Sequence, residues 1–177
     1  FTIVNNIIEN CDDDGVNPST DSERIIIANN IIRNITNDGI HLARNPGTLN
    51  AVVAGNVISG CGGGIGIFKS DTITIVGNVL VNNGVGIMGR TSNDIGKIIV
   101  KGNVINGTTT GNGIDFTYLN VGEISDNIVL NPAGWGITVN NADKIIIHGN
   151  YVYNATRGIY TTASNVKVVG NIVRDAS

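Results

Sequence analysis

The chain has 177 residues, of which 41% are hydrophobic and 14% are charged, and its formal net charge is −3. This much apolar material excludes a disordered chain, and the weakly acidic balance argues against nucleic-acid binding, which requires a basic face. No apolar run approaches the ~20 residues of a membrane-spanning helix. We therefore expect neither a nucleic-acid partner nor a membrane span.

Four residue types dominate the chain, with 29 Ile, 19 Val, 24 Gly and 27 Asn, whereas Leu occurs only 5 times. Ile and Val are β-branched and favour strands, while Gly and Asn favour turns. The composition therefore excludes most helical folds and predicts an all-β protein.

A repeat organises the predicted elements along the chain. Alternating aliphatic residues lead to Gly, Asn or Asp, then Asn, then two or more aliphatic residues. The Asn of this phrase recurs at Asn6, Asn30, Asn56, Asn78, Asn103, Asn127, Asn150 and Asn171. Between these positions, a Gly followed by an aliphatic residue occurs at 15–16, 39–40, 64–65, 86–87, 113–114, 136–137 and 158–159. Each repeat thus predicts a strand, a tight corner, a second strand, a loop and a third strand that opens with Gly.

Strands this short cannot bury a face alone, so successive repeats are expected to stack as coils about 4.8 Å apart. The alternation places Ile25 and Ile27 inward before a corner and Ile32 inward after it. The residue before the corner Asn is always Gly, Asn or Asp, the types that tolerate positive φ. If the corner Asn points inward, its amide is able to bond the coils above and below.

These repeats resemble the right-handed parallel β-helix (pectin-lyase-like) superfamily, specifically its generic repeats. The resemblance implies an all-β, right-handed, single-stranded solenoid of about eight coils that forms one domain over residues 1–177. Both ends lack a covering cap, so we expect an uncapped fragment of a longer protein. The superfamily includes pectate lyases, uronan epimerases, tailspike depolymerases and periplasmic proteins without glycan activity, so the resemblance alone does not choose a function.

Two features bear on metals and redox chemistry. Cys11 and Cys61 lie two coils apart, about 9–10 Å, which exceeds the ~7 Å limit for a disulfide. The run Asp12-Asp13-Asp14 offers oxygen ligands that suit Ca²⁺, but a solvated loop is the simpler interpretation. We therefore expect unpaired thiols, no metal site and no cofactor, with Ca²⁺ at the acidic run as the open alternative.

The outer face of the strands that open with Gly is the expected ligand groove. Its outward positions are Asn17, His41, Gly66, Met88, Asp115, Thr138 and Tyr160. His41 and Asp115 are three coils apart, so they cannot form a direct acid–base pair. A uronate-processing site needs a cation for the carboxylate, a base, and a group that serves the leaving oxygen. The candidate catalytic residues are Lys69, Arg90, Asp115 and Tyr118.

Aromatic and basic residues near this groove are candidates for substrate binding. Trp135, the sole Trp, and Tyr160 lie one coil apart and offer faces on which sugar rings stack. The other candidates are His41, Arg44 and Arg157. The first hypothesis is therefore an extracellular module that binds an acidic polysaccharide, with lyase-like or epimerase-like activity left open. The alternative is a non-catalytic shaft or receptor-binding segment of a virion spike, tail fibre or surface protein.

An apolar stripe follows the outer face of the strands that precede the corners. It contains Ile26, Val52, Ile99 and Ile146, interrupted by Thr74 and Glu123. A stripe several coils long exceeds what a soluble monomer normally exposes. Self-association into a homo-oligomer such as a trimer is therefore expected.

Overall fold

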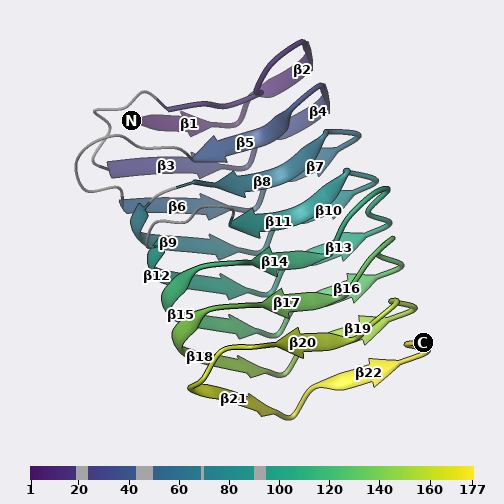
Figure 1. Ribbon diagram of the computed structural model, residues 1–177. Helices are drawn as coiled ribbons and strands as arrows, with labels where there is room; N and C mark the ends of the chain where they lie inside the picture. The colour runs from purple at the N-terminus through teal and green to yellow at the C-terminus, as the bar shows by residue number, and fades with distance from the viewer. Residues whose placement is uncertain (19–23, 43–49, 69, 90–94) are drawn as a thin grey trace.

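A computed structural model describes residues 1–18, 24–42, 50–68, 70–89 and 95–177. In these ranges the regular structure consists of β-strands, without a helix, and the strands pair in parallel. Because no described segment is helical, none forms a helix able to cross a membrane. Successive coils stack into a solenoid with three sheets (Figure 1), which confirms the expected all-β parallel architecture.

Three sheets run along the solenoid. Sheet A contains, in spatial order, β1 (Thr2–Val4), β3 (Arg24–Ala28), β6 (Asn50–Ala54), β9 (Ser70–Val76), β12 (Ile95–Lys101), β15 (Leu119–Ser125), β18 (Ala142–His148) and β21 (Val166–Val169). Sheet B contains β2 (Ile7–Cys11), β4 (Ile31–Ile35), β7 (Val57–Ser59), β10 (Val79–Val81), β13 (Val104–Asn106), β16 (Ile128–Leu130), β19 (Tyr151–Tyr153) and β22 (Ile172–Arg174). Sheet C contains β5 (Asp38–Leu42), β8 (Gly63–Ile67), β11 (Val85–Gly89), β14 (Ile114–Phe116), β17 (Ile137–Val139) and β20 (Ile159–Thr161).

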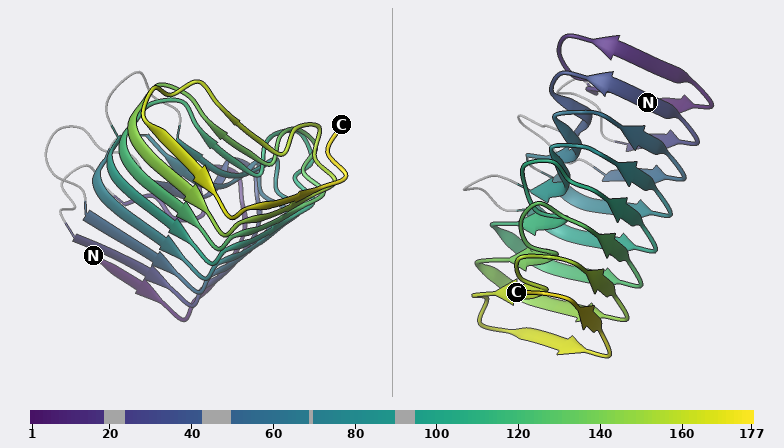
Figure 2. Two further views of the ribbon diagram at one scale, coloured as in Figure 1. Left: turned by 90° about the horizontal axis from the view of Figure 1, so that it is seen from below. Right: turned by 90° about the vertical axis from the view of Figure 1, so that its right-hand side faces the viewer.

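Sheets A and B meet at a sharp corner, and sheet C closes the third side (Figure 2). The residue that turns this corner has positive φ in every coil, as the sequence predicts. The residues are Asn5 (61°), Asn29 (56°), Gly55 (63°), Gly77 (64°), Gly102 (63°), Asp126 (57°), Gly149 (66°) and Gly170 (66°). This left-handed conformation is open to Gly and tolerated by Asn and Asp, which explains the restriction on residue type.

The corner Asn side chains form a continuous ladder inside the solenoid. The backbone N and the Nδ2 of Asn78 donate to Oδ1 of Asn103 at 2.9 and 3.0 Å. Nδ2 of Asn103 also donates to the backbone oxygen of Ile75 at 3.0 Å, across the corner in the preceding coil. The same pattern continues from Asn6 to Asn171. The predicted inward ladder is therefore confirmed.

Aliphatic columns from all three sheets fill the interior. Ile27, Ile32 and Ile65, one from each sheet, are fully buried, as is Phe116 on sheet C. The expected inward columns are thus confirmed in the stacked coils. In the last coil, Val168 and Val173 are 47% and 42% exposed, because no further coil packs against them.

The apolar stripe lies on the outer face of sheet A, in register across its strands. Ile26 and Ile146 are 46% and 37% exposed, whereas Ile99 is half-buried. Thr74 and Glu123 interrupt the stripe as expected. Whether this face mediates self-association stays a prediction.

We expect Asn103→Ala to lower the free energy of unfolding by at least about 2 kcal/mol, because it leaves the backbone N of Asn78 and the oxygen of Ile75 unpaired in the interior. Asn50→Ala, on the exposed outer face of sheet A, is the matched control and should cost no more than ~0.5 kcal/mol. Urea denaturation monitored by circular dichroism measures both. Equal losses in the two variants would show that the ladder contributes nothing beyond an ordinary surface amide.

Candidate functional site

Two parallel columns of side chains run over the outer face of sheet C, which faces the viewer in Figure 1. The edge column holds the residue before each opening Gly: Asp14, Asp38, Gly63, Val85, Asn112, Trp135 and Arg157. Backbone hydrogen bonds between coils keep this column in register. The central column holds the residue three positions further along: Asn17, His41, Gly66, Met88, Asp115, Thr138 and Tyr160. Its strand-borne members from His41 onward are also paired in register.

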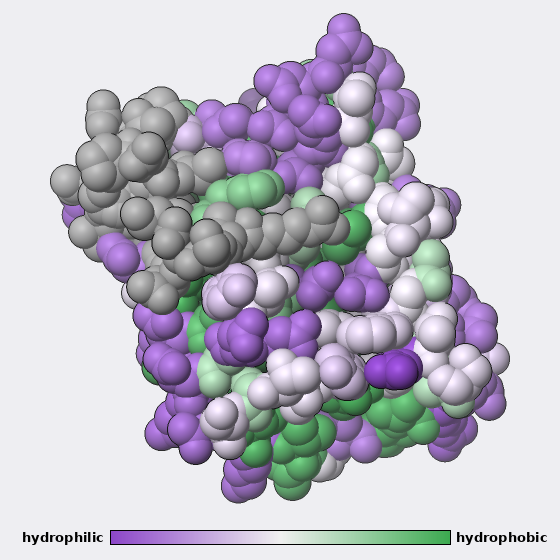
Figure 3. Space-filling model, viewed as in Figure 1, coloured by the Kyte–Doolittle hydropathy of each residue, from purple (hydrophilic) through white to green (hydrophobic). Residues whose placement is uncertain are grey.

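Figure 3 shows this side of the molecule as a mixture of hydrophilic and intermediate side chains, with hydrophobic atoms in smaller patches and at the lower end of the molecule. Within one coil, an edge residue and the central residue three positions later approach each other. Asn17 bonds to Asp14 at 2.8 Å, His41 to Asp38 at 3.0 Å, and Asn112 to Asp115 at 3.0 Å. The chemistry of the face therefore depends on pairs of side chains, each formed by the edge residue and the central residue of one coil.

The N-terminal end of this face carries two carboxylates and an imidazole. Nδ1 of His41 lies 3.0 Å from Oδ2 of Asp38 and 3.6 Å from Oδ2 of Asp14. Oδ1 of Asp14 accepts a hydrogen bond from the backbone N of Asp38 at 3.1 Å, which ties the first coil to the second. The side chains of both aspartates are more than nine-tenths buried, with exposures of 9% for Asp14 and 8% for Asp38.

Two glycines in the next coil make room for the carboxylate of Asp38. A Cβ atom at Gly63 or at Gly66 would collide with the carboxylate oxygens of Asp38. A cavity of about 480 Å³ opens here, and its lining includes Asp14, Asp38, His41 and Met88. The local sequence thus leaves space around the carboxylates where side chains would otherwise fill the face.

Stacking holds the ring of His41 in place, and its surroundings favour the protonated imidazole. It stacks on Phe68 with centroids 4.3 Å apart and an interplanar angle of 21°. The hydrogen bond to Asp38 raises the pKa of His41 above its ordinary value of 6.5, against the opposing effect of burial, and the charges of Asp14, Asp38 and Asp13 raise it further. The carboxylates therefore favour a positive charge between them.

One ligand atom from each of Asp14, Asp38 and His41 lies within 4.8 Å of the others, so these residues could hold a metal ion. The donor set is one imidazole nitrogen and two carboxylate oxygens, which suits a divalent transition metal such as Cu²⁺. Both cysteines are free, and their thiols bond to the backbone oxygens of Glu9 and Ser59. The cluster thus offers nitrogen and oxygen ligands without a thiolate.

The C-terminal end of the same face carries aromatic rings and a guanidinium. The rings of Trp135 and Tyr160 lie 4.7 Å apart with an interplanar angle of 58°. The guanidinium carbon of Arg157 lies 5.0 Å from the centroid of Trp135 and 5.4 Å from that of Tyr160. The backbone N of Trp135 donates to Oδ1 of Asn112 at 2.8 Å, so the neighbouring coil anchors this cluster. Arg157 forms no ion pair with a residue that the structure describes.

The predicted site residues therefore separate into two groups. Trp135, Tyr160 and Arg157 come together as a cluster, whereas His41 pairs with aspartates at the other end. Asp115 is half-buried and bonded to Asn112, and Tyr118 is 38% exposed. The remaining candidates, Lys69, Arg90 and Arg44, lie outside the described residues.

Two residues of the expected groove are covered. Met88 and Thr138 were expected at outward positions, and they are 7% and 1% exposed. They do lie on the outer side of sheet C, where neighbouring side chains cover them. Oγ1 of Thr138, between Asp115 and Tyr160, has no hydrogen-bond partner among the described residues.

Asp38 was not recognised from the sequence, and Asp14 only as part of an acidic loop. A signal was present, because Asp14-Gly15-Val16 and Asp38-Gly39-Ile40 repeat the same phrase. The residue before each Gly was interpreted as loop, although stacking makes it a column of its own. An Asp in two successive coils of one column, beside the outward His41, indicates a cluster of acidic and imidazole groups.

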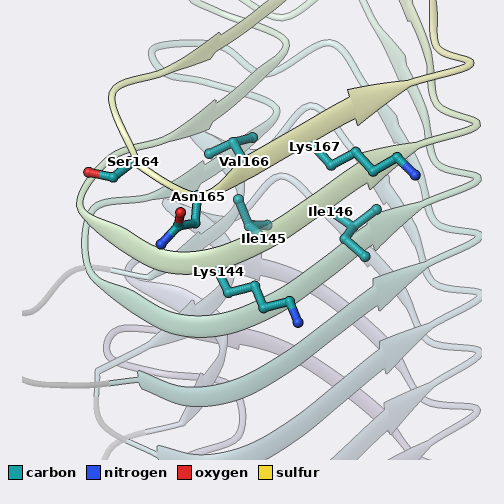
Figure 4. Close-up of a pocket in the computed structure, with 7 residues that line it drawn as sticks. All are labelled: Lys144, Ile145, Ile146, Ser164, Asn165, Val166 and Lys167. Atoms are coloured by element: carbon teal, nitrogen blue, oxygen red, sulfur yellow. The ribbon is translucent and has the colours of Figure 1, made fainter.

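Another hollow, of about 480 Å³, lies on sheet A between β18 and β21 (Figure 4). Its residues are Lys144, Ile145, Ile146, Ser164, Asn165, Val166 and Lys167. The ionisable groups here are two exposed lysines. Such ammonium groups are strongly hydrated and on flexible stems, so they do not fix a ligand as the clusters on sheet C do.

A family model described as "Periplasmic copper-binding protein (NosD)" matches the chain over residues 1–96 and over residues 50–175. The two ranges overlap, as expected when a model of repeats fits a repetitive chain in more than one register. The family has the right-handed parallel β-helix architecture of the pectin-lyase-like type, which confirms the resemblance noted in the sequence. No curated protein matches the chain significantly. No solved structure matches it significantly either.

We expect Asp38→Asn to lower the titration midpoint of His41 in the metal-free protein, because the hydrogen bond to Asp38 is the main cause of its raised pKa. A raised pKa in the folded state means that protonated His41 stabilises the fold below its unfolded value of about 6.5, and that this contribution is lost as pH rises through the folded value. The free energy lost on His41→Gln should therefore be larger near about pH 5.5 than near about pH 9. NMR titration of the His41 ring and urea denaturation measure these effects. An unchanged midpoint in Asp38→Asn would contradict the assigned cause.

Proposed function

The chain belongs to the NosD family, described as periplasmic copper-binding, and we propose that it is a β-helix module that binds copper(II) outside the cytoplasm. The observation that carries this proposal is the cluster of Asp14, Asp38 and His41. The family description, periplasmic, supports a location outside the cytoplasm. The sequence analysis also expected a protein outside the cytoplasm.

The chemistry of the cluster fits copper(II). Imidazole and carboxylate groups are ligands of this ion, which binds most nitrogen and oxygen sites more tightly than the other divalent metals of its row. Two carboxylates supply two negative charges, which balance the charge of the ion. Burial of both carboxylates is costly without a cation. Protonated His41 supplies one positive charge, against two negative charges on the carboxylates. A divalent ion would therefore compensate Asp14 and Asp38 more completely.

We expect wild-type protein to bind one equivalent of Cu²⁺ from copper sulfate. Isothermal titration calorimetry and electron paramagnetic resonance measure this binding. His41→Ala should weaken binding at least about 10-fold, the loss typical even of groups that only support a ligand, and should remove nitrogen coupling from the spectrum. His148→Ala is the matched control, because His148 lies on sheet A beside Glu123 at 3.3 Å. Wild-type protein that binds no Cu²⁺, or equal losses in the two histidine variants, would contradict the proposal.

Binding of an acidic polysaccharide is a second candidate function, favoured by the cluster at the other end of the face. Trp135 and Tyr160 offer apolar ring surfaces, and both hold the guanidinium of Arg157 in one place. A guanidinium held in this way is suited to a carboxylate, which it binds through two parallel hydrogen bonds. Rings beside a cation match the chemistry of a uronate sugar.

This support extends to binding and not to catalysis. Two of the four candidate catalytic residues, Lys69 and Arg90, lie outside the described residues, and Asp115 is bonded to Asn112. Binding is therefore proposed without lyase or epimerase activity. Among the residues that the structure describes, no comparable cluster supports the alternative of a virion shaft or receptor-binding segment.

The fluorescence of Trp135, the sole Trp, reports directly on this cluster. We expect polygalacturonate to change the emission and neutral dextran to leave it unchanged. Arg157→Gln should weaken the interaction at least about 10-fold, because a charge-assisted hydrogen bond contributes about 1.5–3 kcal/mol. Arg33→Gln, which alters a guanidinium paired with Glu9 on sheet B, is the control. An emission that responds to neither polymer, or equally to both, would contradict this candidate.

A further inference from the structure

We propose that the Asp14–Asp38–His41 cluster discriminates between oxidation states: it retains copper as Cu(II) and releases it when the ion is reduced to Cu(I). This inference rests on the proposed function, since it requires that the chain binds copper. The inference adds the condition under which these residues release the metal, namely reduction of the ion to Cu(I).

The donor set is the first basis for this selectivity. Asp14 and Asp38 offer hard, anionic oxygen ligands, and His41 offers one nitrogen. Cu(I) instead prefers soft sulfur ligands. The two carboxylates lie close together, and their side chains are 9% and 8% exposed, so their repulsion is weakly screened by water. Reduction removes one positive charge from the ion between them and leaves this repulsion less compensated.

The positions of the thiols are the second basis for this selectivity, because neither cysteine is placed to bind Cu(I) at the cluster. Cys61 is buried, and its Sγ bonds to the oxygen of Ser59 at 3.4 Å. Burial raises the pKa of the Cys61 thiol, so it stays protonated, whereas metal binding requires the thiolate. Cys11 bonds in the same way to the oxygen of Glu9 at 3.7 Å. Neither cysteine lines the cavity beside His41.

Met88 is the soft group that does line this cavity. Its terminal methyl group reaches back toward Gly63, where a Cβ atom would lie within 2.6 Å of it. The assigned ligands are the two carboxylates and the imidazole, and the thioether of Met88 belongs to the wall of the cavity and not to this ligand set. Met88 is therefore the residue whose replacement distinguishes a soft site from a hard one.

The reductant is a small-molecule electron donor of the ascorbate class. Each copper ion accepts one electron, so one ascorbate monoanion reduces two ions, becomes dehydroascorbate and gives up one proton. The released Cu(I) passes to an acceptor with softer ligands.

The test begins with protein loaded with one equivalent of Cu²⁺ from copper sulfate and freed of excess metal. Under anaerobic conditions, bicinchoninate is added as the Cu(I) acceptor, followed by ascorbate. We expect the copper to stay on the protein until ascorbate arrives. It should then transfer completely, with loss of the paramagnetic signal and growth of the Cu(I)–bicinchoninate absorbance. Met88→Leu should behave as wild type, with Cu²⁺ affinity within about 2-fold, since an isosteric apolar change is tolerated.

The outcomes separate the two proposals. If wild-type protein takes up no Cu²⁺, the proposed function fails and this inference fails with it. If it takes up Cu²⁺ but keeps Cu(I) against bicinchoninate, the inference alone is overturned, and loss of that retention in Met88→Leu would identify the thioether as the cause. Asp38→Asn keeps the shape of the side chain and removes its charge, so loss of Cu²⁺ binding with an unchanged circular dichroism spectrum supports the assigned ligands. Undiminished binding in Asp38→Asn would overturn them.

Discussion

The buried corner amide is the constraint on which the rest of this structure depends. An Asn inside an apolar core is costly unless its donors and acceptor are paired. Here Oδ1 of each corner Asn from Asn30 onward accepts two hydrogen bonds from the coil before, and its Nδ2 donates to that coil's backbone. These bonds are made only when neighbouring coils stack in register. The ladder therefore fixes the stacking interval and the register together, and the aliphatic columns follow from both.

The same register organises the functional face. Once coils stack without slipping, residues at equivalent positions become columns, and each coil contributes one edge residue and one central residue to sheet C. Asp38 meets His41, and Asn112 meets Asp115, through the same spacing of three residues. A cluster of interacting side chains on this fold therefore requires no special loop. It requires suitable residue types at two positions of a coil, and space in the neighbouring coil.

The fold could be predicted because its determinants are local and periodic. Alternation of Ile and Val sets the inward face, and Gly, Asn or Asp marks each positive-φ corner. The site was only partly predictable, because its contacts cross between coils and depend on loop residues. His41 was found by its outward position, whereas Asp38 stood in a segment interpreted as loop. The burial of Met88 and Thr138 could not be read from alternation, which gives the side of a sheet but not what covers it.

The order of residue types along the face explains why its two ends carry different chemistry. In the coil after Asp38, the small residues Gly63 and Gly66 leave the volume that the carboxylate occupies. In the next coil, Val85 and Met88 are buried and form an apolar wall. Beyond this wall the columns carry the bonded pair Asn112 and Asp115, then Thr138, and then aromatic and guanidinium groups. The apolar coil lies between the cluster of Asp14, Asp38 and His41 and the cluster that contains Arg157, and Arg157 has no carboxylate partner among the described residues. Each end of the face is thereby free to bind a ligand of opposite charge.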